Sequence, residues 1–276
     1  MVDNRRILLV SRPLGQVRPA DFALVREPRP VLAEGEFLVR NHSASLDPAM
    51  RGGMDDVPSY MPPIAIGAAV RAGTIGVVVE SRAADYPVGQ WVGGMNALED
   101  YSVGREGGTT RRFAPAANVP ITNYISILGG VGLTAYFGFF EECAPKPGDT
   151  VLVSGAAGAV GSLVGQLAKL HGCRAIGIAG GAAKCERLVS RYGFDAAIDY
   201  RGKSVDALSA AIRDAAPDGV DVVFENVGGD ILDAALLNLR YGARIALCGL
   251  ISEYNAPERV GARNLWSLIV KHASIR

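Results

Sequence analysis

The chain has 276 residues, which is enough for two separate hydrophobic cores. Lysine plus arginine number 28, aspartate plus glutamate also number 28, and the formal net charge is therefore zero. A chain without a basic surplus lacks the positive field that gathers nucleic-acid backbones, so the composition argues against nucleic acid as a partner.

The first part of the chain, to about residue 120, is predicted to be a mainly β domain. Proline and glycine punctuate it, and short alternating runs at 37–40 and 76–80 are typical of strands between turns. Residues 114–140 carry no charge, but prolines, asparagines and glycines interrupt them. We therefore interpret this stretch as buried chain between domains, and we expect no membrane-spanning helix.

The potential metal ligands and disulfide partners are scattered along the chain. They are Cys143, Cys173, Cys185, Cys248, His42, His171 and His272. Cysteines without a paired spacing are typical of free thiols in a reducing compartment, which predicts a cytoplasmic protein. Only His171 and Cys173 lie close together in sequence, and two ligands do not make a zinc site. We therefore predict no bound metal.

From the turn cluster at 145–149 onward, apolar strands alternate with amphipathic helices. The predicted strands are 150–154, 174–179, 196–199, 220–225 and 243–248. The predicted helices are 159–171, 182–192, 204–215 and 230–241. Strands that are apolar on both faces and are joined by helical crossovers form parallel sheets covered on both sides. The second part is thus predicted to be an α/β Rossmann domain with a doubly wound sheet.

A glycine-rich turn joins the first of these strands to the first helix. Ala156, Gly158 and Gly161 occupy the three small positions of the dinucleotide fingerprint. Glycine at the second position allows the backbone to approach a diphosphate, which the unpaired N–H groups of the helix can bind. The sequence predicts cofactor binding at Gly158, Ala159, Val160 and Gly161. The alternative is a glycine turn that serves packing alone.

The end of the second predicted strand indicates which dinucleotide binds. An NAD site usually has an acidic residue there for the ribose hydroxyls, but none occurs between Ser162 and Cys185. Lys184 stands at this position instead, and its charge can pair with the 2′-phosphate of NADPH. The sequence therefore favours NADPH. The alternative for Lys184 is a solvated charge in the first turn of a helix.

Characteristic motifs extend over the whole chain. They are SLDPAMRG at 45–52, GLTAYFG at 132–138, VSGAAGAVGS at 153–162, GGAAKC at 180–185, GFDAAIDY at 193–200, FENVGG at 224–229 and CGLISEYN at 248–255. Together they resemble the zinc-independent alkenal double-bond reductases. This group of the medium-chain dehydrogenase/reductases includes prostaglandin reductases and bacterial curcumin reductases.

The resemblance implies a domain organisation and a set of cofactor contacts. It implies a GroES-like substrate domain at 1–120 and a Rossmann NADP-binding domain at 121–276. Lys184 and Tyr200 would meet the adenosine 2′-phosphate, and Asn226 would contact the cofactor beyond the glycine turn. The residues expected to flank the nicotinamide are Cys248, Gly249, Leu250, Ile251, Ser252 and Tyr254.

Members of this group continue beyond the position of Arg276. The resemblance implies that the further segment supplies the sixth strand of the sheet and the return of the chain to the first domain. Subunit pairing in the group commonly uses this edge of the sheet, where an unpaired strand would expose its backbone groups. We therefore expect a homodimer for the full-length family but not necessarily for this chain.

The implied activity is NADPH-dependent reduction of the carbon–carbon double bond of an α,β-unsaturated ketone or aldehyde. Hydride goes to the β-carbon, and Tyr254 or the cofactor ribose hydroxyl stabilises the enolate oxygen. The substrate is a small molecule. One alternative is an NADPH quinone reductase, and another is a non-catalytic NADPH-binding relative.

Overall fold

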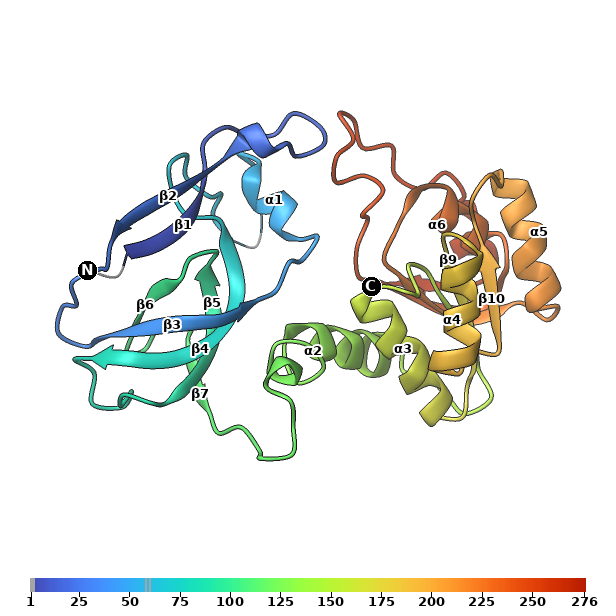
Figure 1. The fold of residues 1–276 in the computed structure, drawn as a ribbon. Coiled ribbons are helices and arrows are strands. Elements are labelled where there is room, and N and C mark those ends of the chain that lie inside the picture. The colour runs from blue at the N-terminus through green and yellow to red at the C-terminus, as the bar shows by residue number, and fades with distance from the viewer. Residues whose placement is uncertain (1–2, 58, 60) are drawn as a thin grey trace. The chain divides into compact units, whose positions relative to one another are not determined.

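The computed structural model describes residues 3–57, 59 and 61–276. The chain divides into two compact units, Met1–Gly130 and Val131–Arg276 (Figure 1). The sequence analysis places the domain boundary earlier, after residue 120. The opening residues Met1 and Val2, which belong to the predicted first domain, lie outside the described residues, as do Pro58 and Tyr60.

The first unit is a β domain with an antiparallel five-stranded sheet. The strand order is β6 (Tyr101–Arg105), β3 (Glu36–Ala44), β4 (Arg71–Ser81), β5 (Trp91–Ala97) and β7 (Arg111–Phe113). A hairpin of β1 (Asp3–Leu9) and β2 (Phe22–Pro28) stands beside it as a two-stranded sheet. The short helix α1 (Met50–Met54) follows β3. Phe37 and Tyr86 stack with ring centroids 4.0 Å apart in the core of this unit.

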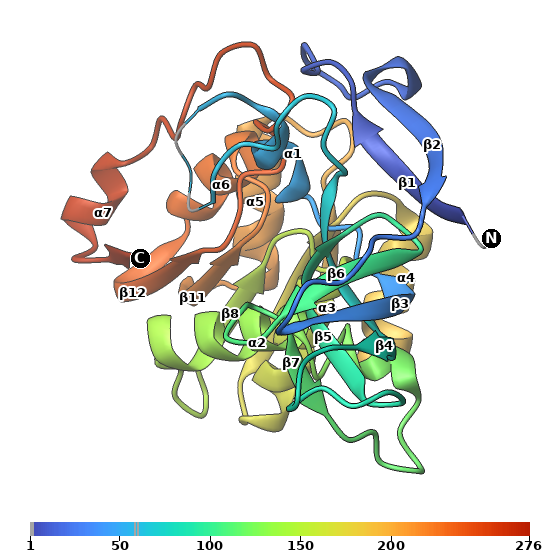
Figure 2. The ribbon, with the colours of Figure 1, turned by 90° about the vertical axis from the view of Figure 1, so that its left-hand side faces the viewer.

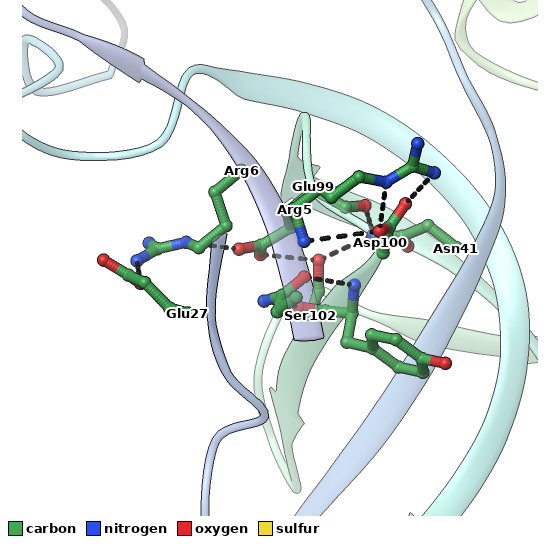
Figure 3. A network of polar contacts seen from close by, with 9 residues as sticks. Arg5, Arg6, Glu27, Asn41, Glu99, Asp100 and Ser102 are labelled. Atoms are coloured by element: carbon green, nitrogen blue, oxygen red, sulfur yellow. Dashed lines mark hydrogen bonds and ion pairs between the residues drawn. The ribbon is translucent and has the colours of Figure 1, made fainter. Parts of the chain in front are cut away.

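Ion pairs fasten the hairpin to the connection between β5 and β6 (Figure 3). The Nε of Arg5 donates to Asp100 at 2.7 Å, and the Nε of Arg6 donates to Glu99 at 2.9 Å. The hydroxyl of Ser102 also donates to Glu99, at 2.8 Å. The hydrogen bond from Arg5 lowers the pKa of Asp100. A single ion pair near the surface stabilises only weakly. Glu99 accepts hydrogen bonds from both Arg6 and Ser102, so the contacts form a network and not isolated pairs.

The second unit is built on a parallel six-stranded sheet. Its order is β10 (Ala196–Asp199), β9 (Arg174–Ala179), β8 (Thr150–Val153), β11 (Val220–Glu225), β12 (Leu239–Leu247) and β13 (Ser274–Ile275). Its helices are α3 (Ala159–Leu170), α4 (Ala182–Tyr192), α5 (Val205–Ala215), α6 (Gly229–Leu236) and α7 (Trp266–Val270). The strand order reverses between β8 and β11, as in a Rossmann sheet. The predicted α/β fold class is therefore confirmed.

Both faces of this sheet are covered by helices. Successive residues of a strand point to opposite faces, so each strand contributes side chains to both packed layers. Val151 and Val153 of β8 pack in one cluster with Val164 of α3. Leu152 lies between them in sequence and packs in the opposite cluster, with Ile212 of α5. This explains why the strands are continuous apolar runs, which is the pattern that identified them in the sequence.

The predicted helix at 230–241 is wrong in its second half. Helix α6 ends at Leu236, and β12 begins at Leu239, which pairs with Val220 of β11. The buried side chain of Asn238 donates from Nδ2 to the carbonyl of Ala234 at 2.8 Å and caps the end of the helix. Helical periodicity continued past this point in the sequence, but strand pairing decided the conformation.

The expectation that the sixth strand is missing from this chain is corrected by the sheet. The short strand β13 pairs with β12 in parallel, with Ser274 beside Arg244 and Ile275 beside Ile245. The C-terminus consequently lies beside β12 at this edge of the sheet (Figure 2).

The uncharged stretch at 114–140 is partly helical and not uniformly buried. It contains a 3-10 helix, Ile121–Tyr124, and α2 (Gly130–Phe137), which continues as a π-helix, Gly138–Glu142. Ala135 is buried, whereas Tyr136 and Phe137 are about half exposed, so the interpretation as buried chain is wrong for this helix. Within the described part of the chain, no helix has the length and apolarity needed to cross a membrane.

Candidate cofactor-binding site

The glycine turn follows β8 and leads into α3, at the carboxyl end of the sheet. Gly155 has a φ of +57°, a conformation that side chains other than glycine rarely adopt. Gly158 is the N-cap of α3 and is extended. A Cβ on Gly161 would lie 2.6 Å from the carbonyl oxygen of Gly155. The third glycine of the fingerprint is thus required because the helix packs directly on the turn.

The N-terminus of α3 fits a diphosphate. The first N–H groups of any α-helix have no partner within the helix, and the N-cap residue Gly158 has no side chain that could cap them. These groups belong to Ala159, Val160 and Gly161. The first turn holds no acidic residue that would repel an anion, and the positive end of the helix dipole favours one.

Asn226 lies directly against this turn, on the neighbouring strand. It follows β11, and its Nδ2 donates to the carbonyl of Ser154 at 2.7 Å. Its backbone N–H donates to the hydroxyl of Ser154, also at 2.7 Å. A Cβ on Gly155 would contact the Cβ of Asn226 at 3.4 Å. The two segments are therefore adjacent at the switch point between β8 and β11.

The loop after β12 is hydrogen-bonded to the end of β11 and to Asn226. The N–H groups of Cys248 and Gly249 both donate to the carbonyl of Glu225, and that of Ile251 donates to the carbonyl of Asn226. Burial raises the pKa of the Cys248 thiol. The structure thus brings the predicted segment 248–254 together with Asn226 and the glycine turn.

Tyr254 closes this loop on itself. Its hydroxyl oxygen accepts a hydrogen bond from the N–H of Leu250 at 3.3 Å. A Cβ on Gly249 would come within 3.0 Å of the same hydroxyl, so glycine leaves space for it. The phenol is partly buried, and the hydroxyl proton stays available for donation to another oxygen.

A second group of predicted residues gathers where β9 and β10 end. Lys184 is exposed in the first turn of α4. Tyr200 follows β10, and a Cβ on Gly180 would lie 3.1 Å from its hydroxyl. A Cβ on Gly181 would lie 2.9 Å from a guanidinium nitrogen of Arg201. The glycine pair after β9 is thus flanked by a phenol and a cation.

Arg201 is a candidate residue that the sequence analysis missed. The Oδ1 of Asp199 accepts from the N–H of Gly181 at 2.8 Å and from the N–H of Arg201 at 3.1 Å, which fixes both turns. The bond from Gly181 is the main cause that lowers the pKa of Asp199. The available signal was a cation directly after Tyr200, at the end of the strand beside β9.

Relatives of known activity match most of the chain. The "NADPH-dependent curcumin reductase" of Escherichia coli (strain K12) is 42% identical over 255 residues, which cover 92% of this chain and 72% of that protein. The "2-alkenal reductase (NADP(+)-dependent)" of Nicotiana tabacum is 40% identical over 274 residues, covering 98% of this chain and 79% of that protein. The chain belongs to the zinc-independent medium-chain dehydrogenase/reductase group.

Solved structures and family profiles agree with this assignment. The crystal structure of CurA in complex with NADPH from Vibrio vulnificus superposes with a TM-score of 0.91 at 39% identity, covering 99% of this chain and 81% of that one. Residues 5–111 match the family described as "N-terminal domain of oxidoreductase", and residues 159–276 match the one described as "Zinc-binding dehydrogenase".

Although one of these family descriptions mentions zinc, the described residues of this chain contain no set of zinc ligands. No three His, Cys, Asp or Glu side chains gather there in a way that could hold a metal ion. His171 and Cys173 instead contact backbone carbonyls of the turn before β8. The Nε2 of His171 lies 3.1 Å from the carbonyl of Pro145, and the Sγ of Cys173 donates to that of Lys146 at 3.3 Å.

A small cavity lies within the first unit, beside the motif at 45–52. Its volume is about 90 Å³. Three methionine side chains contribute to its lining, together with one carboxylate and one guanidinium. These lining residues include Met50, Met61, Met95, Asp47 and Arg71. Methionine adapts its shape to irregular apolar groups, so the cavity suits an apolar ligand with a polar end.

Proposed function

We propose that this protein reduces the carbon–carbon double bond of an α,β-unsaturated ketone or aldehyde, with NADPH as the reductant. The observation that carries the proposal is the switch point between β8 and β11, where a glycine turn, an uncapped helix N-terminus and Asn226 meet; dinucleotides bind in the crevice that such a switch point forms. Relatives at about 40% identity are named as NADPH-dependent reductases of such compounds, which supports the substrate class.

In this proposal the cofactor contacts divide between the two ends of the crevice. The N–H groups of Ala159, Val160 and Gly161 would hold the diphosphate, and Gly158 would let it approach the backbone. Lys184, Tyr200 and Arg201 would surround the adenosine 2′-phosphate, because a phenol and a guanidinium lie beside the Gly180–Gly181 turn and Lys184 stands in the first turn of the helix that follows it. The loop from Cys248 to Tyr254 would flank the nicotinamide.

Replacement of Lys184 by glutamate tests the 2′-phosphate assignment. The variant should bind NADPH at least about tenfold more weakly, since an attraction becomes a repulsion, while NADH affinity changes little. Fluorescence titration with both dinucleotides measures this. Arg191→Glu is the matched control, because it makes the same charge change at the far end of α4. Equal losses for the two dinucleotides would refute the assignment.

The proposed mechanism uses a hydrogen-bond donor from the protein and no metal ligand. NADPH, when bound, supplies the hydride that goes to the β-carbon. Negative charge then develops on the substrate oxygen, and Tyr254 is the residue that would donate a hydrogen bond to it. A proton from solvent or from Tyr254 would then add to the α-carbon and complete the reduction. The N–H of Leu250 donates to the phenol oxygen, which orients the phenol and makes its own proton a better donor.

The first unit would supply the residues that bind the substrate. Its methionine-lined cavity, next to the motif at 45–52, would accommodate the apolar part of the substrate. The assignment of residues 1–120 as substrate domain and 121–276 as NADP-binding domain is part of this proposal.

Turnover of a substrate panel by the wild type and by Tyr254→Phe tests the activity. We expect NADPH oxidation by enones and enals, and a kcat lowered by about tenfold to a hundredfold in the variant with little change in NADPH affinity. Unchanged turnover in the variant would remove Tyr254 from the mechanism. Preference for quinones would favour a quinone reductase, and tight NADPH binding without oxidation by any acceptor would favour a non-catalytic role.

A further inference from the structure

The carboxyl group of Glu225 is buried at the switch point between β8 and β11, and no catalytic step described above uses it. Glu225 is the last residue of β11, and its side chain is fully inaccessible. One oxygen, Oε1, accepts three hydrogen bonds. The hydroxyl of Ser154 donates at 2.6 Å, the N–H of Val227 at 2.6 Å and the N–H of Gly228 at 2.8 Å.

The second oxygen, Oε2, is buried and has no hydrogen-bond partner in the described part of the chain. An ionised carboxylate in such a place needs a cation or further donors. A neutral acid carries no charge that burial would penalise, and because all three donors point at Oε1, its proton lies on Oε2. The donors on Oε1 favour the ionised form, whereas complete burial of the group without a neighbouring cation among the described residues favours the neutral acid.

The elements around Glu225 supply no compensating cation. Residues 150–168, which include β8, the glycine turn and most of α3, contain no charged residue. The titratable groups of the other surrounding segments include Cys248, Glu253 and Tyr254 in the loop after β12, and Asp230 and Asp233 on α6. Arg263, further along the same loop, pairs with both of these aspartates. Burial accordingly raises the pKa of Glu225, against the opposing effect of the donors on Oε1.

Glu225 also joins segments that are far apart in the sequence. Through Ser154 its side chain holds the start of the glycine turn, and through Val227 and Gly228 it holds the start of α6. Its backbone carbonyl accepts from Cys248 and Gly249 in the loop after β12. These segments border the proposed dinucleotide site on three sides.

We propose that Glu225 is a positioning residue for the dinucleotide, which as a buried neutral acid fixes the glycine turn, the start of α6 and the 248–254 loop as one crevice. The inference rests on the proposed function, because it assumes that NADPH occupies this crevice. Loss of the carboxyl group would leave three buried donors without an acceptor, so the segments would shift to find other partners.

Two replacements distinguish a neutral acid from an ionised one. Glutamine keeps an acceptor oxygen for the three donors and cannot ionise, whereas alanine removes the acceptor. At neutral pH, Glu225→Gln should bind NADPH within about threefold of the wild type, and Glu225→Ala should bind at least about tenfold more weakly. Fluorescence titration measures both affinities. A loss in the glutamine variant as large as that in the alanine variant would overturn the proposal.

The pH dependence provides a second readout that does not need NADPH. The native state binds the Glu225 proton more tightly than the unfolded state, so this group's contribution to stability falls as pH rises through its native pKa. Thermal unfolding of the cofactor-free protein, followed from about pH 5 to about pH 9, should show this fall in the wild type and less of it in Glu225→Gln. Identical profiles would overturn the proposal even if the alanine variant fails to fold.

Asp233 offers a matched control for these measurements. It is a buried carboxylate in the same unit, but its hydrogen-bond partners are Arg263 and the N–H of Asn264, and none of them belongs to the glycine turn. Asp233→Asn should leave the alkaline fall in stability in place, and its loss here would count against Glu225 as the cause. Failure of the wild type to bind NADPH at any pH would refute the proposed function, whereas the unfolding profiles would still test the neutral state of Glu225.

Discussion

Replacement of Gly161 by alanine is the most direct test of how the crevice is built. A Cβ at this position would lie 2.6 Å from the carbonyl oxygen of Gly155 and 2.8 Å from the Cα of Ala156. Both neighbours are backbone atoms that cannot rotate away. The N-terminus of α3 must therefore move off the turn, by roughly the shortfall from an ordinary contact.

Two effects set the expected magnitude. Crowding in a packed site costs about 1–3 kcal/mol of stability. Displacement of the helix also weakens its N–H contacts with the diphosphate, and a hydrogen bond to a charged group contributes about 1.5–3 kcal/mol. Loss of one such bond weakens dinucleotide binding by about tenfold to a hundredfold. NADPH and NADH should lose affinity equally, because they share the diphosphate.

The assay is fluorescence titration of both dinucleotides, paired with urea denaturation of the free protein. Gly130→Ala is the control, because Gly130 begins α2 and a Cβ there would meet nothing within 4 Å. We expect the control to keep its affinity. Wild-type affinity in Gly161→Ala would refute the reasoning, and so would a loss confined to NADPH, since that pattern belongs to the 2′-phosphate site.

Two further predictions concern stability. A Cβ on Gly165 would lie 1.8 Å from the ring of Phe194, so Gly165→Ala should lower the free energy of unfolding by about 1–3 kcal/mol, measured by urea denaturation. Adding Phe194→Leu should recover part of this loss. No recovery would exclude the ring as the cause. Burial alone would raise the pKa of Asp233, but Arg263 and backbone N–H groups lower it. The stabilisation from Asp233 should therefore be complete near neutral pH and disappear as pH falls below about 4, so acid unfolding of the wild type and Asp233→Asn should converge there.

The local pattern of the second unit was sufficient to predict most of its sheet. The predicted strands 174–179, 196–199 and 220–225 coincide with β9, β10 and β11, because strands buried on both faces must be apolar throughout. The position of the glycine turn could also be predicted, since strand, turn and helix follow one another along the chain. The helix at 230–241 failed because pairing of Leu239 with Val220 outweighed local periodicity.

The amino-acid sequence by itself determined the fold class and favoured NADPH as the cofactor. The proposed roles of the glycine turn and of Lys184 rest on the same kind of evidence, because all of these patterns lie in residues close together in the chain. Only the tertiary structure decided the surroundings of Glu225 and the approach of Arg201 to the Gly180–Gly181 turn. Sequence spacing does not encode such contacts. The folding of a parallel sheet creates them, because it brings the carboxyl ends of separate strands to one edge and removes water from the groups that meet there.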